Sequence, residues 1–511
     1  MHLNDPVGEE EPAASTLCDR VLLIVMLALL VFTGIRAYVL SITHDEVLSA
    51  LIHAKAPLGD IFAHSVGTQG ANNHLLNTLL MKFFSSFFGD GEIILRLPAL
   101  IGHSIYLIAI YRLCSFFFQG WRRILSVLLL ITSPFLVDFF SCARGYSLGI
   151  GFSMLALSVV LPLLASSHRI SIKRFIVFIV LIDLAVLSNV IFTNMLIALV
   201  LVILISDIYL AMTGGSKLMA AAGSCLHRFI VPLIAGAIPL LVIYRPEVVG
   251  RIRAGMGGYG GKNGLWQDTV QTLVECSLYD RSYPLITTVS IMAVIAFFVI
   301  VGILISLYKT NTNNSLAKNA QVTVISIILL VCFVMVVQFH LFSVPYAVDR
   351  SALFLIPLYL LYLLLLFDYG SKIKSRLVGI MIMAVTGLFL GLLLMHQVSC
   401  LNLTHYYLWR FDASAKDAMQ RISDLGRKDQ KRPRTIGVTW QLEPAMNYYR
   451  FRFGVDWIPL IDRSSPDGEY DVYYVAQHER YVVEKRELTA IEEYPISGCV
   501  LALSPKYNVA P

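Results

Sequence analysis

Hydrophobic residues in this chain form long runs separated by short polar segments, the pattern of helices that cross a membrane. About 20 apolar residues in helical conformation span a bilayer core of about 30 Å. The polar break after the fifth run is thin, because Ser188, Asn189, Thr193 and Asn194 are its main polar residues. The pattern predicts eleven spans, near residues 21–40, 94–115, 124–140, 147–165, 175–191, 193–212, 229–245, 284–308, 321–341, 352–367 and 377–396.

Basic residues are concentrated in alternate short loops between these runs, which predicts how the chain is oriented. The remaining short loops, which lie between the basic ones along the chain, carry only Arg144 and Arg350. Loops rich in Lys and Arg stay in the cytoplasm. Residues 1–20 are therefore expected to be cytoplasmic, and the loops 41–93 and 246–283 to lie outside. The basic set comprises Arg122, Arg123, Arg169, Lys173, Arg174, Lys217, Arg228, Lys309, Lys318, Lys372, Lys374 and Arg376.

The composition agrees with a membrane protein. Of the 511 residues, 57% are hydrophobic and 14% are charged, whereas soluble domains carry about 25% charged residues. The first apolar run follows an acidic segment and is too long for a signal-peptide core, so we interpret it as a retained anchor. The net charge of +6 reflects the basic loops, and no nucleic-acid partner is expected.

After residue 399 the sequence becomes richer in charged residues and alternates helix and strand patterns. Asp412 to Leu425 reads as a helix, with Asp412 as N-cap and Gly426 as C-cap. Three segments read as strands: Thr435–Trp440, Tyr470–Val475 and Cys499–Leu503. The predicted fold class is an all-α polytopic membrane protein whose transmembrane domain, residues 21–399, precedes a small extracytoplasmic α/β domain, residues 400–511.

The first outer loop is organised and begins with the titratable run Thr43-His44-Asp45-Glu46. Such a cluster at the end of a span is costly unless it meets water, a partner or a substrate. Farther along, apolar residues recur at helical spacing, so that segment is expected to lie in the outer membrane interface or to pack on the bundle. They are Leu75, Leu76, Leu79, Leu80, Phe83, Phe84, Phe87 and Phe88.

Cysteine and acidic patterns give no clear metal or redox motif. The eight cysteines show no CxxC spacing. Cys276, Cys400 and Cys499 would lie outside the cytoplasm, where a disulfide can form, although unpaired small apolar residues are the alternative. The first loop has no DxD motif, and residues 467–471 read as a turn before a strand. No cofactor is expected; a divalent metal is compatible with the sequence but not required by it.

Four short motifs follow one another along the chain, all on the predicted outer side. They are Asp45-Glu46 after the first span, Arg96-Leu97-Pro98-Ala99-Leu100, Ala143-Arg144-Gly145-Tyr146, and Arg350 before the span that contains Pro357. In this order they resemble the GT-C superfamily of membrane glycosyltransferases. The branch they are most similar to comprises glycosyltransferase family 39, the protein O-mannosyltransferases and the bacterial aminoarabinose transferases. The resemblance covers residues 20 to about 400.

The resemblance implies a polyprenyl-phosphate-sugar-dependent glycosyltransferase in the cell (inner) membrane. Such an enzyme transfers a sugar, with inversion, from a polyprenyl-phosphate donor to a hydroxyl of a lipid, glycan or protein acceptor at the outer face. An inverting displacement of a phosphate needs one base. By motif match Asp45 is that base; the alternative is a solvated helix-end carboxylate. Glu46 is expected to assist, to orient Asp45 or to cap the next helix, and His44 to tune Asp45.

Arginines of the outer loops are the expected phosphate ligands. Arg144 and Arg350 can clamp the phosphate of the donor; the alternative is that each extends to water or lipid headgroups. Tyr146 belongs to the same motif as Arg144 and is assigned to substrate binding. Arg96 lies where the chain re-enters the membrane and is expected to anchor lipid headgroups.

The segment Asn72-Asn73-His74 departs from the family pattern, which often has a proline-rich segment here. Its amide and imidazole groups can bind sugar hydroxyls or the acceptor; alternatively, Asn72 or Asn73 caps the following helix. In loop 246–283, the arginines and the run Gly257-Gly258-Tyr259-Gly260-Gly261-Lys262 indicate either a segment that closes over substrate or a disordered linker.

Two other classes of function remain open. A transporter or flippase of lipid-linked sugars would place ionisable groups near the middle of the membrane. Here the spans contain few charges, with Asp183 the plainest exception. A catalytically inactive relative that acts as a scaffold would keep the fold without needing Asp45.

Overall fold

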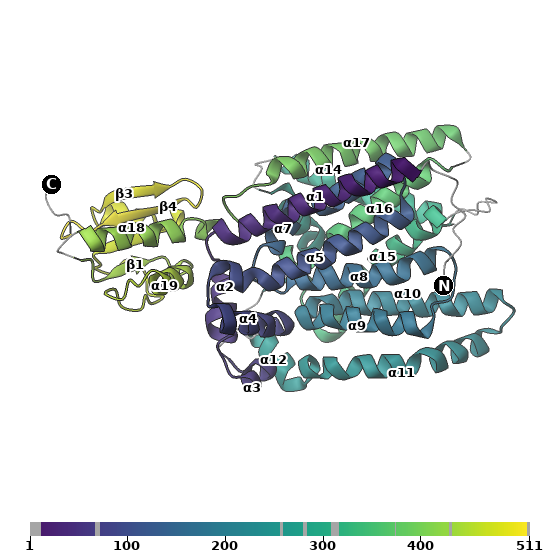
Figure 1. Cartoon of the computed structure of the whole chain (residues 1–511), viewed down its shortest axis with the longest axis horizontal. Helices are drawn as coiled ribbons and strands as arrows, with labels where there is room; N and C mark the ends of the chain where they lie inside the picture. Colours follow the sequence, from purple (N-terminus) through teal and green to yellow (C-terminus); the bar gives the residue numbers. More distant parts are fainter. Residues whose placement is uncertain are drawn as a thin grey trace.

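The computed structural model describes residues 12–66, 72–255, 259–279, 284–307, 316–373, 375–428 and 432–507. Long helices run side by side in one bundle, and a small α/β domain stands at one end of it (Figure 1). The predicted fold class, a polytopic helical membrane protein with a small C-terminal α/β domain, is confirmed. Gly257, Gly258, Lys309 and Lys374 lie outside the described residues, as do residues 1–11.

Every predicted apolar run is helical in the structure. Among the described residues, eight helices are long and apolar enough to cross a membrane, and the pair α6 and α7, bent by 63°, would make a ninth. The predicted number of eleven is therefore approximate, because α9 has 17 residues and α16 has 16. The helices are α1 Pro12–Val39, α5 Glu92–Phe117, α6 Gly120–Ile131, α7 Pro134–Phe140, α8 Tyr146–Ala165, α9 Ile172–Ser188, α10 Thr193–Thr213, α11 Leu218–Tyr244, α14 Leu285–Leu307, α15 Leu316–Phe342, α16 Leu355–Gly370 and α17 Arg376–Cys400.

The breaks between helices have local causes. Pro134 begins α7, where a proline is tolerated because the first helical N–H has no intrahelical acceptor. The thin polar break in the sequence is a real one: Asn189 is extended, and its side chain accepts a hydrogen bond from the Ile191 N–H at 3.2 Å, opening the short 3₁₀ helix Val190–Phe192.

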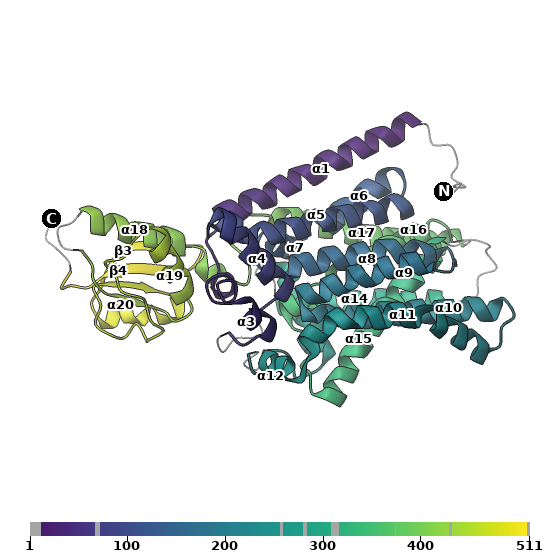
Figure 2. The same ribbon diagram turned by 60° about the horizontal axis from the view of Figure 1, so that its bottom comes forward.

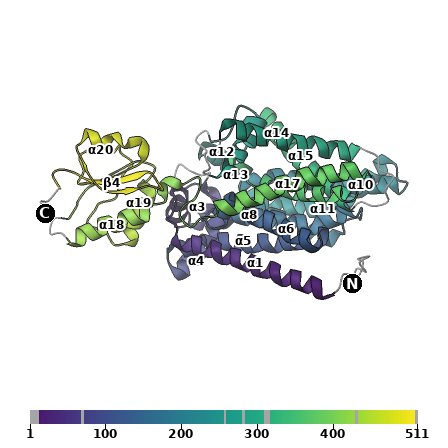
Figure 3. The same ribbon diagram turned by 90° about the horizontal axis from the view of Figure 1, so that it is seen from above.

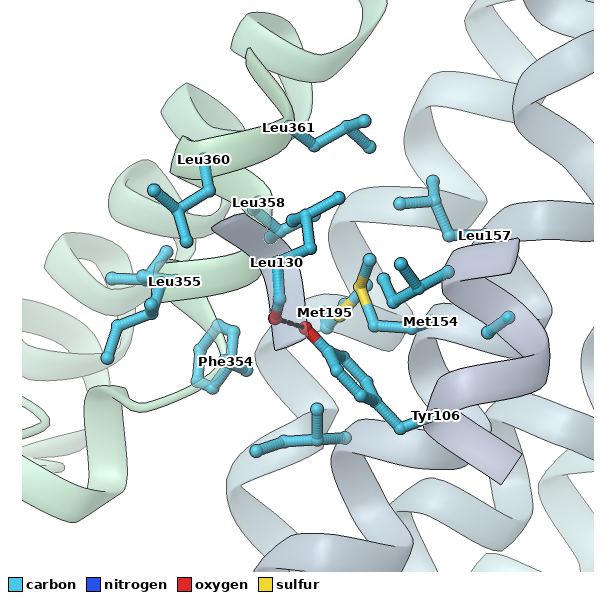
Figure 4. Packing of buried hydrophobic residues seen from close by; sticks show 14 of the residues in the cluster. Tyr106, Leu130, Met154, Leu157, Met195, Phe354, Leu355, Leu358, Leu360 and Leu361 are labelled. Atoms are coloured by element: carbon cyan, nitrogen blue, oxygen red, sulfur yellow. Dashed lines mark hydrogen bonds between the residues drawn. The ribbon is translucent and has the colours of Figure 1, made fainter. Parts of the chain in front are cut away.

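The bundle interior is packed with apolar side chains from helices far apart in the sequence. Figure 4 shows Met154 of α8, Met195 of α10 and Phe354, just before α16, gathered around Tyr106 of α5. The buried Tyr106 hydroxyl donates to the Leu130 carbonyl at 2.6 Å. A buried hydroxyl needs such a partner, and this hydrogen bond joins α5 to α6.

Several short helices form the end of the bundle that faces the α/β domain (Figures 1 and 3). The described parts of the basic loops lie at the opposite end. This arrangement agrees with the sidedness predicted from the Lys and Arg residues. The short helices are α2 His44–Val47, the π-helix Leu48–His53, α3 Leu58–Ala63, α4 Leu75–Phe88, α12 Pro246–Gly255, the π-helix Leu265–Gln271, α13 Thr272–Leu278 and the 3₁₀ helix Asp349–Ala352.

Helix α4 turns part of its apolar face outward. Phe83, Phe87 and Phe88 are exposed, whereas the polar Asn77 and Ser85 are buried against the protein. This is the reverse of what a water-exposed surface helix shows. The orientation fits a helix that lies in the membrane interface and packs on the bundle with its other face.

The C-terminal domain holds a four-stranded sheet of order β1-β2-β4-β3, in which β1 pairs with β2 in parallel and the other pairs are antiparallel. Its strands are β1 Ile436–Val438, β2 Val472–Val475, β3 Thr489–Tyr494 and β4 Cys499–Leu503, and its helices are α18 Ala415–Lys428, α19 Glu443–Arg452 and α20 Tyr481–Lys485. Figure 2 shows helices on both sides of the sheet.

Three strands were predicted and β3 was missed, because most of its residues are at least partly exposed and give no apolar run. The helix predicted from Asp412 to Leu425 has different bounds at both ends. Helix α18 continues through Gly426, and Asp412 lies in a separate 3₁₀ turn, Arg410–Asp412. The Asp412 carboxylate instead accepts a hydrogen bond from another part of the chain, described below.

The C-terminal domain is fixed on the first outer loop by specific contacts. The Ile42 N–H donates to the Tyr449 hydroxyl at 2.7 Å, and the Tyr448 hydroxyl donates to the Asp90 carbonyl at 2.7 Å. Lys416 forms an ion pair with Glu92 at 3.1 Å. The two parts also share one apolar cluster, so the domain and the first loop pack as a unit.

All eight cysteines carry free thiols in the structure. Cys276, Cys400 and Cys499 are buried. Of the two alternatives for these residues, the structure therefore has unpaired cysteines.

Candidate functional site

The site is built on a buried ion pair at the end of the first span. Arg96 Nε and Nη2 donate to the two carboxylate oxygens of Glu46, each at 2.8 Å, and both side chains are fully buried. Arg96 also donates to the carbonyls of Ala37, Leu40 and Ser41 at 2.8–3.0 Å. The prediction that Arg96 anchors lipid headgroups is wrong, because the side chain points into the protein, where Glu46 neutralises it.

Glu46 has its oxygens fully engaged. Oε2 accepts the Thr43 N–H at 2.8 Å, while the Thr43 hydroxyl accepts the Glu46 N–H, which makes a capping box at the start of α2. Oε1 accepts the Ala143 N–H at 2.6 Å. Of the alternatives for Glu46, the geometry supports capping of α2 and orientation of Asp45, since both carboxylate oxygens are held by donors of the protein.

Asp45 lies beside this pair and points toward two cations from distant parts of the chain. Its Oδ2 is 3.3 Å from Arg350 Nη2 and 3.7 Å from Arg144 Nη2. Oδ2 nevertheless has no hydrogen-bond donor among the described residues. The Asp45 side chain is 12% exposed and that of Arg350 is 20% exposed. Oδ2 is therefore held by charge, without a hydrogen-bond donor among the described residues.

The charges around Asp45 keep it ionised. Burial is the largest influence and raises the pKa of Asp45, but the positive charges of Arg144, Arg350 and His44 together hold that pKa below its ordinary value of 3.8. A carboxylate near two guanidinium groups behaves in this way. At neutral pH the site holds a carboxylate and two guanidinium ions in contact.

Arg144 is fixed in place by the first loop. Its Nη1 donates to the Ser49 hydroxyl at 3.0 Å, and its Nη2 donates to Asn72 Oδ1 at 2.9 Å. The side chain is buried. Of the two alternatives for Arg144, the structure excludes extension to water or lipid headgroups.

Gly145 allows this segment to lie close to its neighbours. A Cβ atom at Gly145 would lie 2.0 Å from the Ser188 carbonyl oxygen and 2.8 Å from the His74 Cβ. Any side chain at this position would push apart α8 and the ends of α4 and α9. The small residue of the Ala-Arg-Gly-Tyr motif is thus required by packing, independently of catalysis.

The other predicted residues of the first loop have different partners. Asn72 binds Arg144, as described, whereas the Asn73 side chain donates to the Ile61 carbonyl at 2.7 Å. The ring of His74 packs edge-on against Tyr146 at 5.4 Å between centroids. His74 occupies the N-cap position of α4 without a capping hydrogen bond. The predicted alternative, a cap by Asn72 or Asn73, is therefore wrong.

Electrostatics keep His74 neutral. Burial, followed by the positive charges of Arg144 and Arg350, lowers the pKa of His74 well below its ordinary value of 6.5. Its buried Nε2 has no hydrogen-bond partner among the described residues. A neutral imidazole can accept or donate one hydrogen bond, so His74 can still bind a polar group of a ligand.

Arg350 is positioned by aromatic rings from two other segments. Its guanidinium lies 4.8 Å from the ring centre of Tyr259 and 5.4 Å from that of Trp409. Such cation–π contacts orient the guanidinium without using its N–H groups. The Tyr259 hydroxyl also donates to the carboxylate of Asp349.

The loop around Tyr259 is fixed in its described part. Gly261 and Tyr346 form an antiparallel bridge, with N–H to carbonyl distances of 2.9 and 3.0 Å. The Thr269 hydroxyl donates to the Ala347 carbonyl at 2.7 Å. Residues 259–279 are therefore ordered and not a disordered linker, and Tyr259 lies beside Arg350. Closure of this segment over a substrate stays a prediction.

His44 faces the C-terminal domain. Its backbone N–H donates to Asp412 Oδ2 at 2.7 Å, and its Nδ1 lies 2.7 Å from the Gln441 carbonyl. The ring also contacts that of Trp440, with centroids 6.1 Å apart. The sequence placed His44 beside Asp45 but gave no sign that the C-terminal domain would hold it.

A second buried network was not predicted at all. Arg36 of α1 forms an ion pair with Asp138 of α7 at 2.5 Å. Asp138 also accepts the Tyr279 hydroxyl at 2.7 Å and the Tyr407 N–H at 2.8 Å. The only signal in the sequence was a single arginine within the first apolar run. This network fastens the segment before the C-terminal domain, which includes Trp409, to the bundle.

One carboxylate and two guanidinium groups therefore meet at the end of the bundle that faces the C-terminal domain. Guanidinium groups bind phosphate through charge-assisted hydrogen bonds. A carboxylate without a hydrogen-bond donor can accept a proton from a hydroxyl. Among the described residues, no group of three or more His, Cys, Asp or Glu side chains is arranged to hold a metal ion.

No protein-family model and no curated protein matches this sequence. Among solved structures, ArnT from Cupriavidus metallidurans bound to undecaprenyl phosphate is similar over 97% of this chain and 99% of its own, with 11% identity and a TM-score of 0.44. The apo state of the same protein has a TM-score of 0.43 at 11% identity, covering 98% of this chain and 100% of its own.

The oligosaccharyltransferase of Archaeoglobus fulgidus, tethered with an acceptor peptide, is similar over 95% of this chain and 74% of its own, with 12% identity and a TM-score of 0.38. At these levels of identity and structural agreement, the chemistry of this chain must be derived from its own residues.

Proposed function

We propose that this protein transfers a sugar, with inversion, from a polyprenyl-phosphate donor to an acceptor hydroxyl at the outer face of the cell membrane. The observation that carries the proposal is the contact of Asp45 with Arg144 and Arg350 at the end of the first span. These groups supply what the reaction requires: cations for a phosphate leaving group and one base for the acceptor.

In the resting site Asp45 offsets one of the two positive charges of Arg144 and Arg350, which leaves a net charge of +1. The donor is a phosphodiester with one negative charge, so the same guanidinium groups would attract it. Asp45 would then lose part of the positive charge that lowers its pKa, and so become a better base. Donor binding thus prepares the base for the acceptor.

The chemical step follows from this arrangement. The acceptor oxygen attacks the anomeric carbon on the face opposite the phosphate, and its proton passes to Asp45. The bond between the anomeric carbon and the phosphate oxygen breaks, and Arg350 and Arg144 neutralise the polyprenyl phosphate that leaves. Glu46 and Arg96 hold Asp45 in position and take no proton. The step needs no metal or organic cofactor.

Two features support a reaction at the outer membrane surface. The exposed phenylalanines of α4 would lie among lipids, and the basic loops lie at the other end of the bundle, as expected if this end is outside. The donor's isoprenoid chain would stay in the bilayer while its phosphate reaches Arg350. The acceptor, a lipid, glycan or protein, would approach from the side of the C-terminal domain.

The proposal is tested by incubating the purified protein in lipid vesicles with a panel of polyprenyl-phosphate sugars and a mixture of lipid, glycan and peptide acceptors, and measuring release of polyprenyl phosphate. We expect at least one donor to be consumed by the wild-type protein and left intact by Arg350→Gln, since a phosphate bound by one guanidinium fewer is a poorer leaving group. If every donor stays intact while the protein moves lipid-linked sugars across the bilayer, the protein is a flippase and the proposal is wrong.

A further inference from the structure

The C-terminal domain brings the carboxyl end of a parallel strand to the site. Strand β1 pairs in parallel with β2, and the chain leaves β1 through Thr439, Trp440 and Gln441. In sheets with parallel strands, ligands bind at this edge. Here the edge meets His44, which directly precedes Asp45, through the Gln441 carbonyl and the ring of Trp440.

Trp440 is placed as a binding surface rather than as a core residue. Its side chain is 47% exposed, although an indole is one of the largest apolar groups of a protein. One contact, the edge-on one with His44, joins it to the first loop. A half-exposed indole offers an apolar face together with a polar N–H.

A second, independent feature of the same place is an unfilled hydrogen-bonding position. Asp412 is almost fully buried. Its Oδ2 accepts the His44 N–H, but its Oδ1 has no hydrogen-bond partner among the described residues. Burial raises the pKa of Asp412 well above its ordinary value, and the negative charges of Asp45 and Glu46 raise it further. A neutral Asp412 can both donate and accept.

Leaving such a buried group without a partner is unfavourable, so a ligand hydroxyl that forms this hydrogen bond would bind more tightly. An apolar face beside imidazole and carboxyl groups matches one class of ligand closely. A sugar ring has a face of C–H groups and a rim of hydroxyls. An acyl chain has no hydroxyls and could not form hydrogen bonds with the polar neighbours.

We infer that Trp440, His44 and Asp412 form the acceptor subsite and that the acceptor is a saccharide whose ring stacks on Trp440. The C-terminal domain then has a direct part in the reaction, since it presents the acceptor hydroxyl to Asp45. This inference rests on the proposed function, which it extends from the donor to the acceptor.

The test measures saccharide binding without any donor. Full-length protein in nanodiscs, which avoid sugar-based detergents, is mixed with methyl glycosides of glucose, galactose, mannose and N-acetylglucosamine, and saturation-transfer NMR records which ring protons contact the protein. We expect signals from at least one glycoside, a loss of at least five-fold in Trp440→Ala, and recovery in Trp440→Phe, which keeps an aromatic face.

Trp266 offers a matched control, because it is also 47% exposed and lies in the other outer loop. Trp266→Ala should leave the glycoside signals unchanged. The inference is overturned if no glycoside gives a signal, if Trp440→Ala keeps the signals, or if a serine-containing hexapeptide added as a second probe gives the Trp440-dependent signal instead.

Binding of undecaprenyl phosphate, measured on the same samples, separates this inference from the proposed function. Protein that binds undecaprenyl phosphate through Arg350 but no saccharide contradicts the acceptor subsite alone. Protein that binds neither contradicts both.

Discussion

Asp45→Asn is expected to lower the rate of sugar transfer by about 10²- to 10⁴-fold, the usual contribution of a general base. Asparagine has nearly the same size but cannot take the proton of the acceptor hydroxyl. It also carries no charge to hold Arg144 and Arg350 (3.7 and 3.3 Å from Asp45). The affinity for undecaprenyl phosphate should therefore stay the same or rise, which separates loss of the base from loss of the site.

The pH profile gives an additional check on the same residue. The pKa of Asp45 in the free protein is lowered from 3.8, and a base must be ionised to act. The profile of kcat/KM should thus show no acid limb due to Asp45 between pH 5 and 9. An acid limb near pH 6 that disappears in Asp45→Asn, or Asp45→Asn protein with wild-type kcat, would contradict the assigned role.

Arg96→Met is expected to give the largest loss of stability. Removing one partner of a buried ion pair leaves the other charge uncompensated and costs about 3–5 kcal/mol. Glu46 would be that uncompensated charge, since it is fully buried and Arg96 is its ion-pair partner. The measurement is the unfolding temperature of the purified protein in detergent, followed by light scattering and intrinsic fluorescence.

A double mutant distinguishes the loss of this ion pair from a general packing effect. Glu46→Gln together with Arg96→Met should lose less stability than the sum of the two single changes, because no buried charge remains. Arg480→Met serves as control, since Arg480 and Glu493 form an exposed ion pair, and exposed pairs contribute little. A shift for Arg96→Met no larger than that for Arg480→Met would show that the buried pair does not hold the first loop.

The sequence predicted the parts of this molecule that depend on local patterns. Apolar runs located every long helix, and the thin polar break at Asn189 proved to be a real helix break. The order of the short motifs identified Asp45, Arg144 and Arg350 as candidate site residues, and the structure places these three together. Their roles in donor binding and proton transfer stay predictions until activity is measured.

What the sequence could not predict are contacts between residues far apart along the chain. Arg96 looked like a lipid anchor, because nothing local shows that Glu46, fifty positions earlier, neutralises it. The contact of His44 with Asp412 and Gln441 spans nearly 400 positions. The side of a helix that a polar residue faces, and hence its partner, is decided by tertiary packing.

The most direct test of the central claim is the anomeric configuration of the first product formed from a donor of known configuration. A single carboxylate acting as base permits one displacement, so the NMR coupling constant of the new glycosidic bond should report inversion. Retention would require a nucleophile on the protein and a second displacement. Retained configuration would therefore contradict the role assigned to Asp45.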